Sequence, residues 1–276
     1  MQQQANSLFE HQLKLEKLYD KNQAVKRIHH EFTSSEIDFE GFFLEHNVDV
    51  DFGYDLLTQM VLHKRATLPT LVGILRKHFS GPTASQKAAD MLQLCAALDL
   101  VDWSPTTEQF VIRINITDDV QADIDRFQYP LPMVIRPRHV RNNRDTGYLL
   151  TRNSIILKKN YHEDDVCLDH INRVNRIRFE INFDTASMIA NRWRNLDKPK
   201  EGETKQDFDK RVRAFEKYDR TAKEVITQLL AHGNSFFLTH KYDKRGRVYC
   251  QGYHVNYQGA PWNKAVIELA DKELVE

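Results

Sequence analysis

Apolar side chains recur at helical spacing over most of this chain, and that pattern limits the folds it can adopt. Amphipathic segments of this kind cover residues 5–31, 54–65, 67–79, 85–100 and 117–129. Strand-like patterns are confined to three short patches. The sequence therefore predicts a mainly α fold with small β patches, which is an α+β protein.

The second half of the chain contains two longer helical patterns. They cover residues 162–196 and 205–232, and a charged linker, "NLDKPKEGETKQ", lies between them. After the second, the pattern is strand, turn and strand, and a last helix begins at Trp262. We expect the two long segments to form an antiparallel helical hairpin, and a domain boundary near residues 125–135.

Composition excludes several classes of protein. The 276 residues include 39 acidic and 39 basic side chains, so the net charge is zero, and there is no apolar run of membrane-spanning length. The first residues lack the basic and apolar regions of a secretory signal. Three widely spaced cysteines favour a reducing, cytoplasmic setting without disulfides. Because the apolar runs are too short to span a bilayer, no membrane partner is expected.

Residues 101–112 predict a β-hairpin directly after a helix. Trp103, Ser104 and Pro105 lie near its tip, where an apolar side chain can act as a wedge between base pairs. Alternatively, Trp103 packs on the protein's own core. Helices followed by a tight hairpin also resemble a winged-helix arrangement, so a stand-alone DNA-binding regulator is a second hypothesis.

Residues 136–159 form a basic segment, in which seven positive charges stand against Asp145 alone. Such density can attract nucleic-acid phosphates through release of their counterions, although a solvated loop has the same composition. The seven residues are Arg136, Arg138, Arg141, Arg144, Arg152, Lys158 and Lys159.

The run "HEDDVCLDH" contains side chains that often bind metal ions. These are His162, Asp165, Cys167, Asp169 and His170. On a helix, however, positions 162, 165 and 169 share one face, and positions 167 and 170 do not. Acidic residues at a helix start also complement the helix dipole, so no metal site is predicted.

The tail segment "KYDKRGRVY" concentrates features of a site that contacts phosphate. Gly246 lets a ligand approach the backbone, and Arg247 can bind phosphate or a base edge through two donors. Tyr249 can stack on a base or ribose, and Asp243 can hold the turn rigid by pairing with an arginine.

These motifs resemble those of single-subunit bacteriophage and mitochondrial-type RNA polymerases. "DKRGRVY" and "NYQGAPWNKAVIELA" are similar to the family's D-x-x-G-R motif and the segment after it. Upstream, "LPMVIRP" with "TGYLL", and "INRVNRIRFEIN", resemble the family's P-M-V-x-P-P segment and the start of its thumb. The matches follow the family's order over residues 130–276.

The resemblance implies a role for each matched residue. Residues near the tail would contact the template strand and the RNA–DNA hybrid, those of the second long helix would be thumb contacts, and the hairpin 101–112 would separate the strands. The template and hybrid residues are Asp243, Arg245, Gly246, Arg247, Tyr249, Gln258, Gly259 and Lys264, and the thumb residues are Lys217 and Arg220.

It also implies an order of domains. Residues 1–130 would form the N-terminal helical domain, 131–170 a connecting basic segment, 171–232 the thumb helices and 233–276 the start of the palm. No catalytic residue is expected here, because no carboxylate has the context of the family's metal-binding aspartates.

We therefore expect the small, N-terminal subunit of a heterodimeric RNA polymerase, inactive alone. A larger subunit would carry the palm core and fingers, with the catalytic aspartates and their Mg2+. Template DNA and the RNA transcript would be further partners, and a single-stranded-DNA-binding helper protein is another candidate. The expected location is the cytoplasm of an infected bacterial host.

Overall fold

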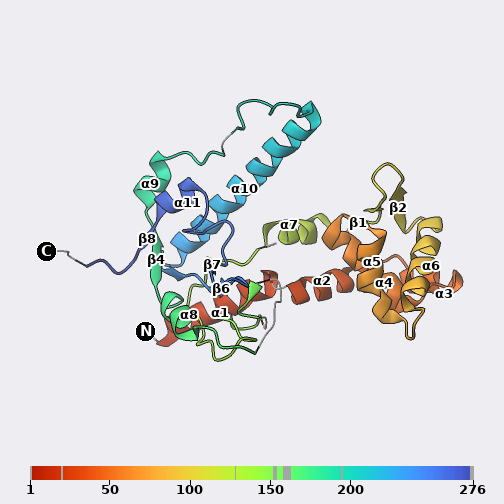
Figure 1. Ribbon diagram of the computed structural model, residues 1–276, viewed down its shortest axis with the longest axis horizontal. Coiled ribbons are helices and arrows are strands. Elements are labelled where there is room, and N and C mark those ends of the chain that lie inside the picture. Colours follow the sequence, from red (N-terminus) through yellow and green to blue (C-terminus); the bar gives the residue numbers. More distant parts are fainter. Residues whose placement is uncertain are drawn as a thin grey trace. The chain divides into compact units, whose positions relative to one another are not determined.

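Helices hold most of the regular structure of this protein. A computed structural model describes residues 2–19, 21–127, 129–151, 154–157, 163–193 and 195–273. The strands of these residues form three small antiparallel sheets (Figure 1). The predicted α+β class is confirmed.

The chain divides into two units. One contains residues 21–125, and the other contains residues 1–20 together with 126–276. The sequence indicated residues 1–130 as an N-terminal domain, whereas the structure places the first twenty residues with the C-terminal part.

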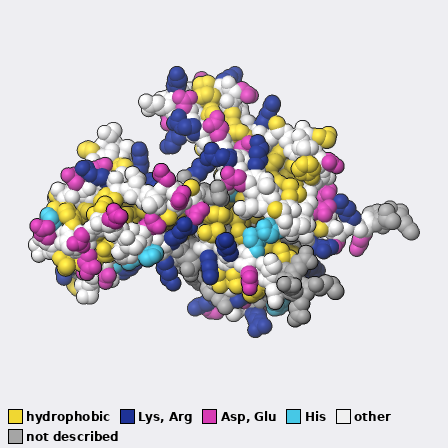
Figure 2. Space-filling model, turned by 180° about the vertical axis from the view of Figure 1, so that it is seen from behind, with side chains coloured by type: hydrophobic (Ala, Val, Ile, Leu, Met, Phe, Trp, Pro, Cys, Tyr) yellow, Lys and Arg dark blue, Asp and Glu magenta, His cyan; other side chains and the backbone are white. Residues whose placement is uncertain are grey.

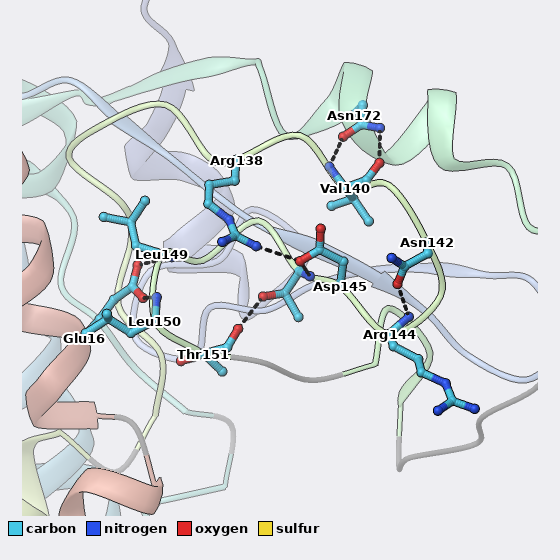
Figure 3. A network of polar contacts seen from close by, with 11 residues as sticks. Glu16, Arg138, Val140, Asn142, Arg144, Asp145, Leu149, Leu150, Thr151 and Asn172 are labelled. Carbon is cyan, nitrogen blue, oxygen red and sulfur yellow. Dashed lines mark hydrogen bonds and ion pairs between the residues drawn. The ribbon is translucent and has the colours of Figure 1, made fainter.

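Buried polar side chains of α1 (Gln2–Tyr19) explain this placement. Gln12 and Glu16 are both fully buried, and the Gln12 Oε1 atom accepts a hydrogen bond of 2.9 Å from the Val134 backbone. The Glu16 carboxylate accepts bonds of 2.8 and 2.6 Å from the backbone N–H groups of Leu149 and Leu150 (Figure 3). Because these backbone donors belong to irregular segments, α1 supplies the acceptors that a sheet would otherwise provide.

The unit of residues 21–125 is helical with one three-stranded sheet. Its strands lie in the order β1-β3-β2, and the predicted hairpin is confirmed as β2 and β3. The additional strand β1 pairs with β3 and was not expected. The elements are α2 (Lys21–Thr33), α3 (Phe39–Glu45), α4 (Val50–His63), β1 (Arg65–Thr67), α5 (Leu68–Leu75), the 3-10 turn η1 (Arg76–His78), α6 (Ala84–Ala97), β2 (Val101–Ser104), β3 (Gln109–Ile112) and α7 (Asp118–Arg126).

Helix α4 is the centre of this unit's core. Every residue from Phe52 to Val61 is buried, so the helix is surrounded by other elements rather than covered on one side. A Cβ atom at Gly53 would lie 2.8 Å from the Phe43 ring, and this contact lets α3 pack closely on α4.

The second unit has short helices, one long helix and two small sheets. One sheet has the order β5-β4-β8, and the other pairs β6 with β7. Besides α1, its elements are α8 (Leu168–Val174), β4 (Arg178–Ile181), α9 (Phe183–Met188), α10 (Lys205–Ala231), β5 (Phe236–Phe237), β6 (His240–Tyr242), β7 (Val248–Cys250), α11 (Pro261–Val266) and β8 (Ile267–Leu269).

The prediction of one long helix over residues 162–196 is wrong. The described residues of that range form α8, β4 and α9 instead. Phe179 and Ile181 are buried on alternate positions of β4, which pairs with β5 on one side and β8 on the other. The expected helical hairpin therefore contains one long helix, α10.

Helix α10 has 27 residues and a well-formed start. The Thr204 side chain accepts a hydrogen bond from the Asp207 backbone and donates one to the Asp207 carboxylate, so this N-terminus is capped. Its C-terminal half packs in the core through Ala222, Val225 and Leu229, and its N-terminal half projects from the unit (Figure 1).

Candidate nucleic-acid interface

A tight turn between β6 and β7 contains the residues of the D-x-x-G-R motif. The backbones of Asp243 and Arg247 are joined by a hydrogen bond of 2.8 Å, and Gly246 has a φ of +78°, which favours glycine. The Asp243 Oδ1 atom also accepts from the backbone N–H groups of Arg245, at 2.9 Å, and Arg247, at 3.0 Å. The Asp243 carboxylate therefore organises the turn from within.

The Arg247 side chain is held in one orientation. Its Nε and Nη2 atoms donate to the Asp243 Oδ2 atom at 2.7 and 2.6 Å, and its guanidinium lies 5.3 Å from the centre of the Tyr249 ring. The side chain nevertheless stays 54% exposed. This arrangement presents an oriented guanidinium to an anion in solution.

Electrostatics agree with this geometry. Desolvation acts to raise the pKa of Asp243, but the hydrogen bonds and the charge of Arg247 outweigh it and lower that pKa. The hydrogen bond to Asp243 in turn raises the pKa of Arg247, so the pairing favours the charged form of both groups. Both groups are therefore charged over the whole physiological range of pH.

Gln258 and Gly259 lie beside the same hairpin, in supporting positions. The Gln258 amide accepts a 2.8 Å bond from the Cys250 backbone and donates a 3.2 Å bond to the Val248 carbonyl, so it lines the outer edge of β7. A Cβ atom at Gly259 would lie 2.9 Å from the Asn256 carbonyl oxygen, which explains the need for glycine there. Their contact with a template stays a prediction.

A buried group that the sequence did not reveal anchors β6. His240 is fully buried, and its backbone N–H and its Nδ1 atom both lie 2.9 Å from the Asn175 Oδ1 atom. Its Nε2 atom lies 2.9 Å from the Tyr257 hydroxyl. Burial first, and then the charge of His170, lowers the pKa of His240 to about 4, so the ring is neutral and donates through Nδ1.

Lys264 lies on the exposed side of α11, which a buried asparagine ties to α10. The Asn263 Nδ2 atom donates a 2.8 Å hydrogen bond to the Tyr218 hydroxyl. This bond joins the segment after the D-x-x-G-R turn to the long helix, so Lys264 is carried on a supported helix rather than on a loop.

The predicted thumb residues Lys217 and Arg220 belong to a basic stripe on α10. Lys210 and Arg213 precede them at helical spacing on the same side, so the four cations span about 15 Å at 1.5 Å per residue. Figure 2 shows Lys and Arg side chains, in dark blue, around the projecting end of this helix. Sequence spacing could have extended the predicted pair to all four residues.

Arg211 of the same helix has a structural role instead. It donates bonds of 2.8 and 2.7 Å to the Glu203 carboxylate, in the segment that leads into α10. These bonds from Arg211 lower the pKa of Glu203 to about 2. Arg211 thus fixes the start of the helix and is not part of the stripe.

In the hairpin of the other unit, Trp103 has features of both predicted roles, a wedge between base pairs and a side chain packed on the protein's own core. The indole packs edge-on against Phe110 at 4.9 Å, yet it remains 44% exposed. Ser104 accepts a 3.0 Å hydrogen bond from Thr107, which closes the turn, and Pro105 is exposed. The wedge role stays a prediction.

The basic segment has a mixed character. Arg138 pairs with Asp145 and Arg144 pairs with Glu163, whereas Arg136 and Arg141 are exposed. Of the other predicted cations and metal ligands, four lie outside the described residues: Arg152, Lys158, Lys159 and His162.

No metal-binding cluster forms among the residues that the structure describes, counting groups of three or more His, Cys, Asp or Glu side chains. Within the same residues, no helix combines the length and the apolar content that crossing a membrane requires.

Comparison with known proteins relates the chain to RNA polymerases. No family model matches it. A probable DNA-directed RNA polymerase of Agaricus bitorquis is 28% identical over 195 residues, which cover 60% of this chain and 18% of that protein. Another, of Gelasinospora sp. (strain G114), is 26% identical over 159 residues, covering 53% of this chain and 18% of that protein.

The chain thus spans less than a fifth of the length of these two relatives. The names of both relatives indicate nucleotidyltransferases that make RNA. More particularly, both are named as probable DNA-directed RNA polymerases.

Proposed function

We propose that this chain is a nucleic-acid-binding subunit of a phage-type DNA-directed RNA polymerase, which holds the template strand and the RNA–DNA hybrid. The observation that carries the proposal is the turn from Asp243 to Arg247, in which an exposed guanidinium is already oriented. Such an arginine binds phosphate with little further loss of side-chain freedom. The similarity to two polymerases supports this choice of ligand.

In the proposal, the other residues extend the same surface. Arg245 and Lys264 contact the sugar-phosphate backbone, and Tyr249 borders the strand that Arg247 binds. The stripe on α10, with Lys217 and Arg220, grips the duplex as a thumb, because its spacing presents a row of cations to one strand. The hairpin with Trp103 separates the strands.

The described residues do not fit the Mg2+ ions that a polymerase uses. No group of three or more His, Cys, Asp or Glu side chains among them could hold a metal ion, and Asp243 is already engaged by Arg247 and two backbone N–H groups. We therefore assign the metal-binding aspartates to a larger partner subunit with the palm core and fingers, so that this chain is inactive alone.

The proposed setting is the cytoplasm of an infected bacterium, with a single-stranded-DNA-binding protein as a candidate helper.

Substitution of Arg247 tests the proposal. Arg247→Ala should weaken binding to a short RNA–DNA hybrid with a template overhang by about tenfold or more, since a charged hydrogen bond contributes about 1.5–3 kcal/mol. It should also reduce the slope of log affinity against log salt concentration by the amount that corresponds to about one phosphate contact. Fluorescence anisotropy over a salt series measures both quantities.

Arg178→Ala is the matched control, because Arg178 is also an exposed arginine that pairs with an aspartate, Asp271, in the same unit. If both variants lose affinity equally, or neither does, the assignment of Arg247 is wrong.

A stand-alone DNA-binding regulator is the second candidate. The sheet β1-β3-β2 beside α5 and α6 favours it, because a small sheet following helices is the arrangement of a winged DNA-binding domain. This alternative requires tight binding to duplex DNA that Arg247→Ala leaves unchanged. The same anisotropy series, run with duplex DNA, separates the two functions.

A further inference from the structure

A hollow of about 790 Å3 lies among the residues that follow the proline-rich segment. Three arginines line it, Arg138, Arg141 and Arg144, and two carboxylates, Asp145 and Glu163, also reach it. None of these residues belongs to the D-x-x-G-R turn, and the hollow has no role in the interface described above.

The backbone around the hollow is held by hydrogen bonds from side chains, of which that of Asn172 is buried. The amide of Asn172, on α8, accepts a 2.8 Å hydrogen bond from the Val140 N–H and donates a 2.9 Å bond to the Val140 carbonyl (Figure 3). Asn142 Oδ1 accepts a 2.9 Å bond from the Arg144 N–H, and Asp145 Oδ1 accepts one from the Thr146 N–H. The loop that carries the arginines is therefore preorganised.

The three arginines differ in how firmly they are held. Arg138 donates a 2.7 Å bond to Asp145, and both side chains are mostly buried, so this pair fixes one wall. Arg144 contacts Glu163 at 2.6 Å, but their side chains are 69% and 78% exposed, and exposed ion pairs contribute little. Arg141 is exposed, and no ion pair is recorded for it within the described residues.

This combination is suited to an anion that enters from solvent. An anion placed in the hollow would form an ion pair with Arg141 directly. It would form one with Arg144 by displacing the weakly held carboxylate of Glu163. The Asn142 amide and the His139 ring also line the hollow and can hydrogen-bond or stack with a base. The faces and the Watson–Crick edges of bases are accessible to a protein when the strand is unpaired, because pairing and stacking cover them in a duplex.

We propose that this hollow binds the phosphodiester backbone of a single nucleic-acid strand, with Arg141 and Arg144 as phosphate ligands and Glu163 as a displaceable carboxylate. The choice of nucleic acid as the ligand rests on the proposed function. The phosphodiester chemistry is common to unpaired DNA and to RNA leaving the hybrid, so both are probes in the experiment.

The experiment measures binding of short fluorescent oligonucleotides, one of DNA and one of RNA, to the full chain over a salt series. Arg141→Ala and Arg144→Ala should each weaken binding about three- to tenfold and reduce the magnitude of the salt slope by about 0.7. Glu163→Gln should strengthen binding about two- to threefold, because it removes the competing charge. Lys87→Ala, on α6 of the other unit, controls for loss of one charge.

The direction of the Glu163→Gln effect makes the test decisive. If Arg144 and Glu163 were only a structural pair, Arg144→Ala and Glu163→Gln would change the oligonucleotide affinity in the same direction. Binding that survives Arg141→Ala and Arg144→Ala unchanged, or a loss of affinity in Glu163→Gln, would overturn the proposal. Stronger binding of the RNA probe assigns the hollow to the transcript, and stronger binding of the DNA probe assigns it to an unpaired template strand.

The outcome is independent of the Arg247 experiment. That experiment uses the RNA–DNA hybrid, so the two results can differ. Hybrid binding that depends on Arg247, combined with oligonucleotide binding that ignores Arg141 and Arg144, would reject the hollow alone.

Discussion

Among single residues, Gly252 has the tightest steric constraint of the chain's glycines. A Cβ atom there would lie 2.0 Å from the Val255 carbonyl oxygen, and the Gly252 carbonyl accepts a 2.6 Å hydrogen bond from the Asn256 amide. The turn they form leads from β7 to Gln258, which lines the edge of that strand. Gly246 differs, because its φ is positive but an added Cβ would meet nothing within 4 Å.

Gly252→Ala should therefore destabilise the protein by more than about 2 kcal/mol, since a backbone atom would have to move. Gly246→Ala should cost only about 1 kcal/mol, the penalty of a left-handed conformation. Chemical unfolding followed by tryptophan fluorescence compares the two free energies. Equal costs would mean that the turn at Gly252 adjusts without strain.

The sequence could predict residues whose role is local, and the D-x-x-G-R turn is an example. Asp243, Gly246 and Arg247 lie within five positions, so spacing and residue type alone indicated a rigid basic turn. The hydrogen bonds of His240 with Asn175 were invisible for the opposite reason, because 65 residues separate the partners. Their contact depends on how α8 packs against β6, which no local pattern reports.

At the scale of elements, the same distinction explains the error over residues 162–196. Apolar residues at helical spacing, such as Ile171 and Val174, predicted one helix. The strand β4 exists because Phe179 and Ile181 pair with β5 and with β8, which lies almost 90 residues further along the chain. The hairpin of β2 and β3 was predictable, since its pairing partners are adjacent in sequence.

The exposed hairpin supports a prediction at this scale. Trp103→Ala should impair opening of a duplex template more than binding to a pre-melted one, because an exposed ring near the tip is needed only where bases must be unstacked. A 2-aminopurine probe in the template measures opening, and anisotropy measures binding. Since Trp103 also packs on Phe110, the thermal midpoint is compared with that of Phe110→Leu. Equal losses on both templates would contradict the wedge.

At the scale of the whole molecule, apolar surface in the second unit indicates where the proposed larger subunit binds. Met188 of α9 is 81% exposed and Phe183 is 60% exposed, and both line a hollow of about 440 Å3 together with Trp262. β8 lies at the edge of its sheet, and strands at an edge can pair with another chain. Exposed apolar side chains beside a sheet edge are typical of a surface that a partner covers.

Met188→Asp should therefore weaken association with a second chain that carries the metal-binding aspartates, because a charge would have to be buried at the contact. Sedimentation of the mixed chains measures association, and RNA synthesis on a promoter-free template measures the assembled activity. Both should fall together in Met188→Asp. Ile37→Asp is the matched control, since Ile37 is an apolar residue with 60% exposure in the other unit. RNA synthesis by this chain alone would refute the two-chain proposal, and full activity of the Met188→Asp mixture would refute the surface.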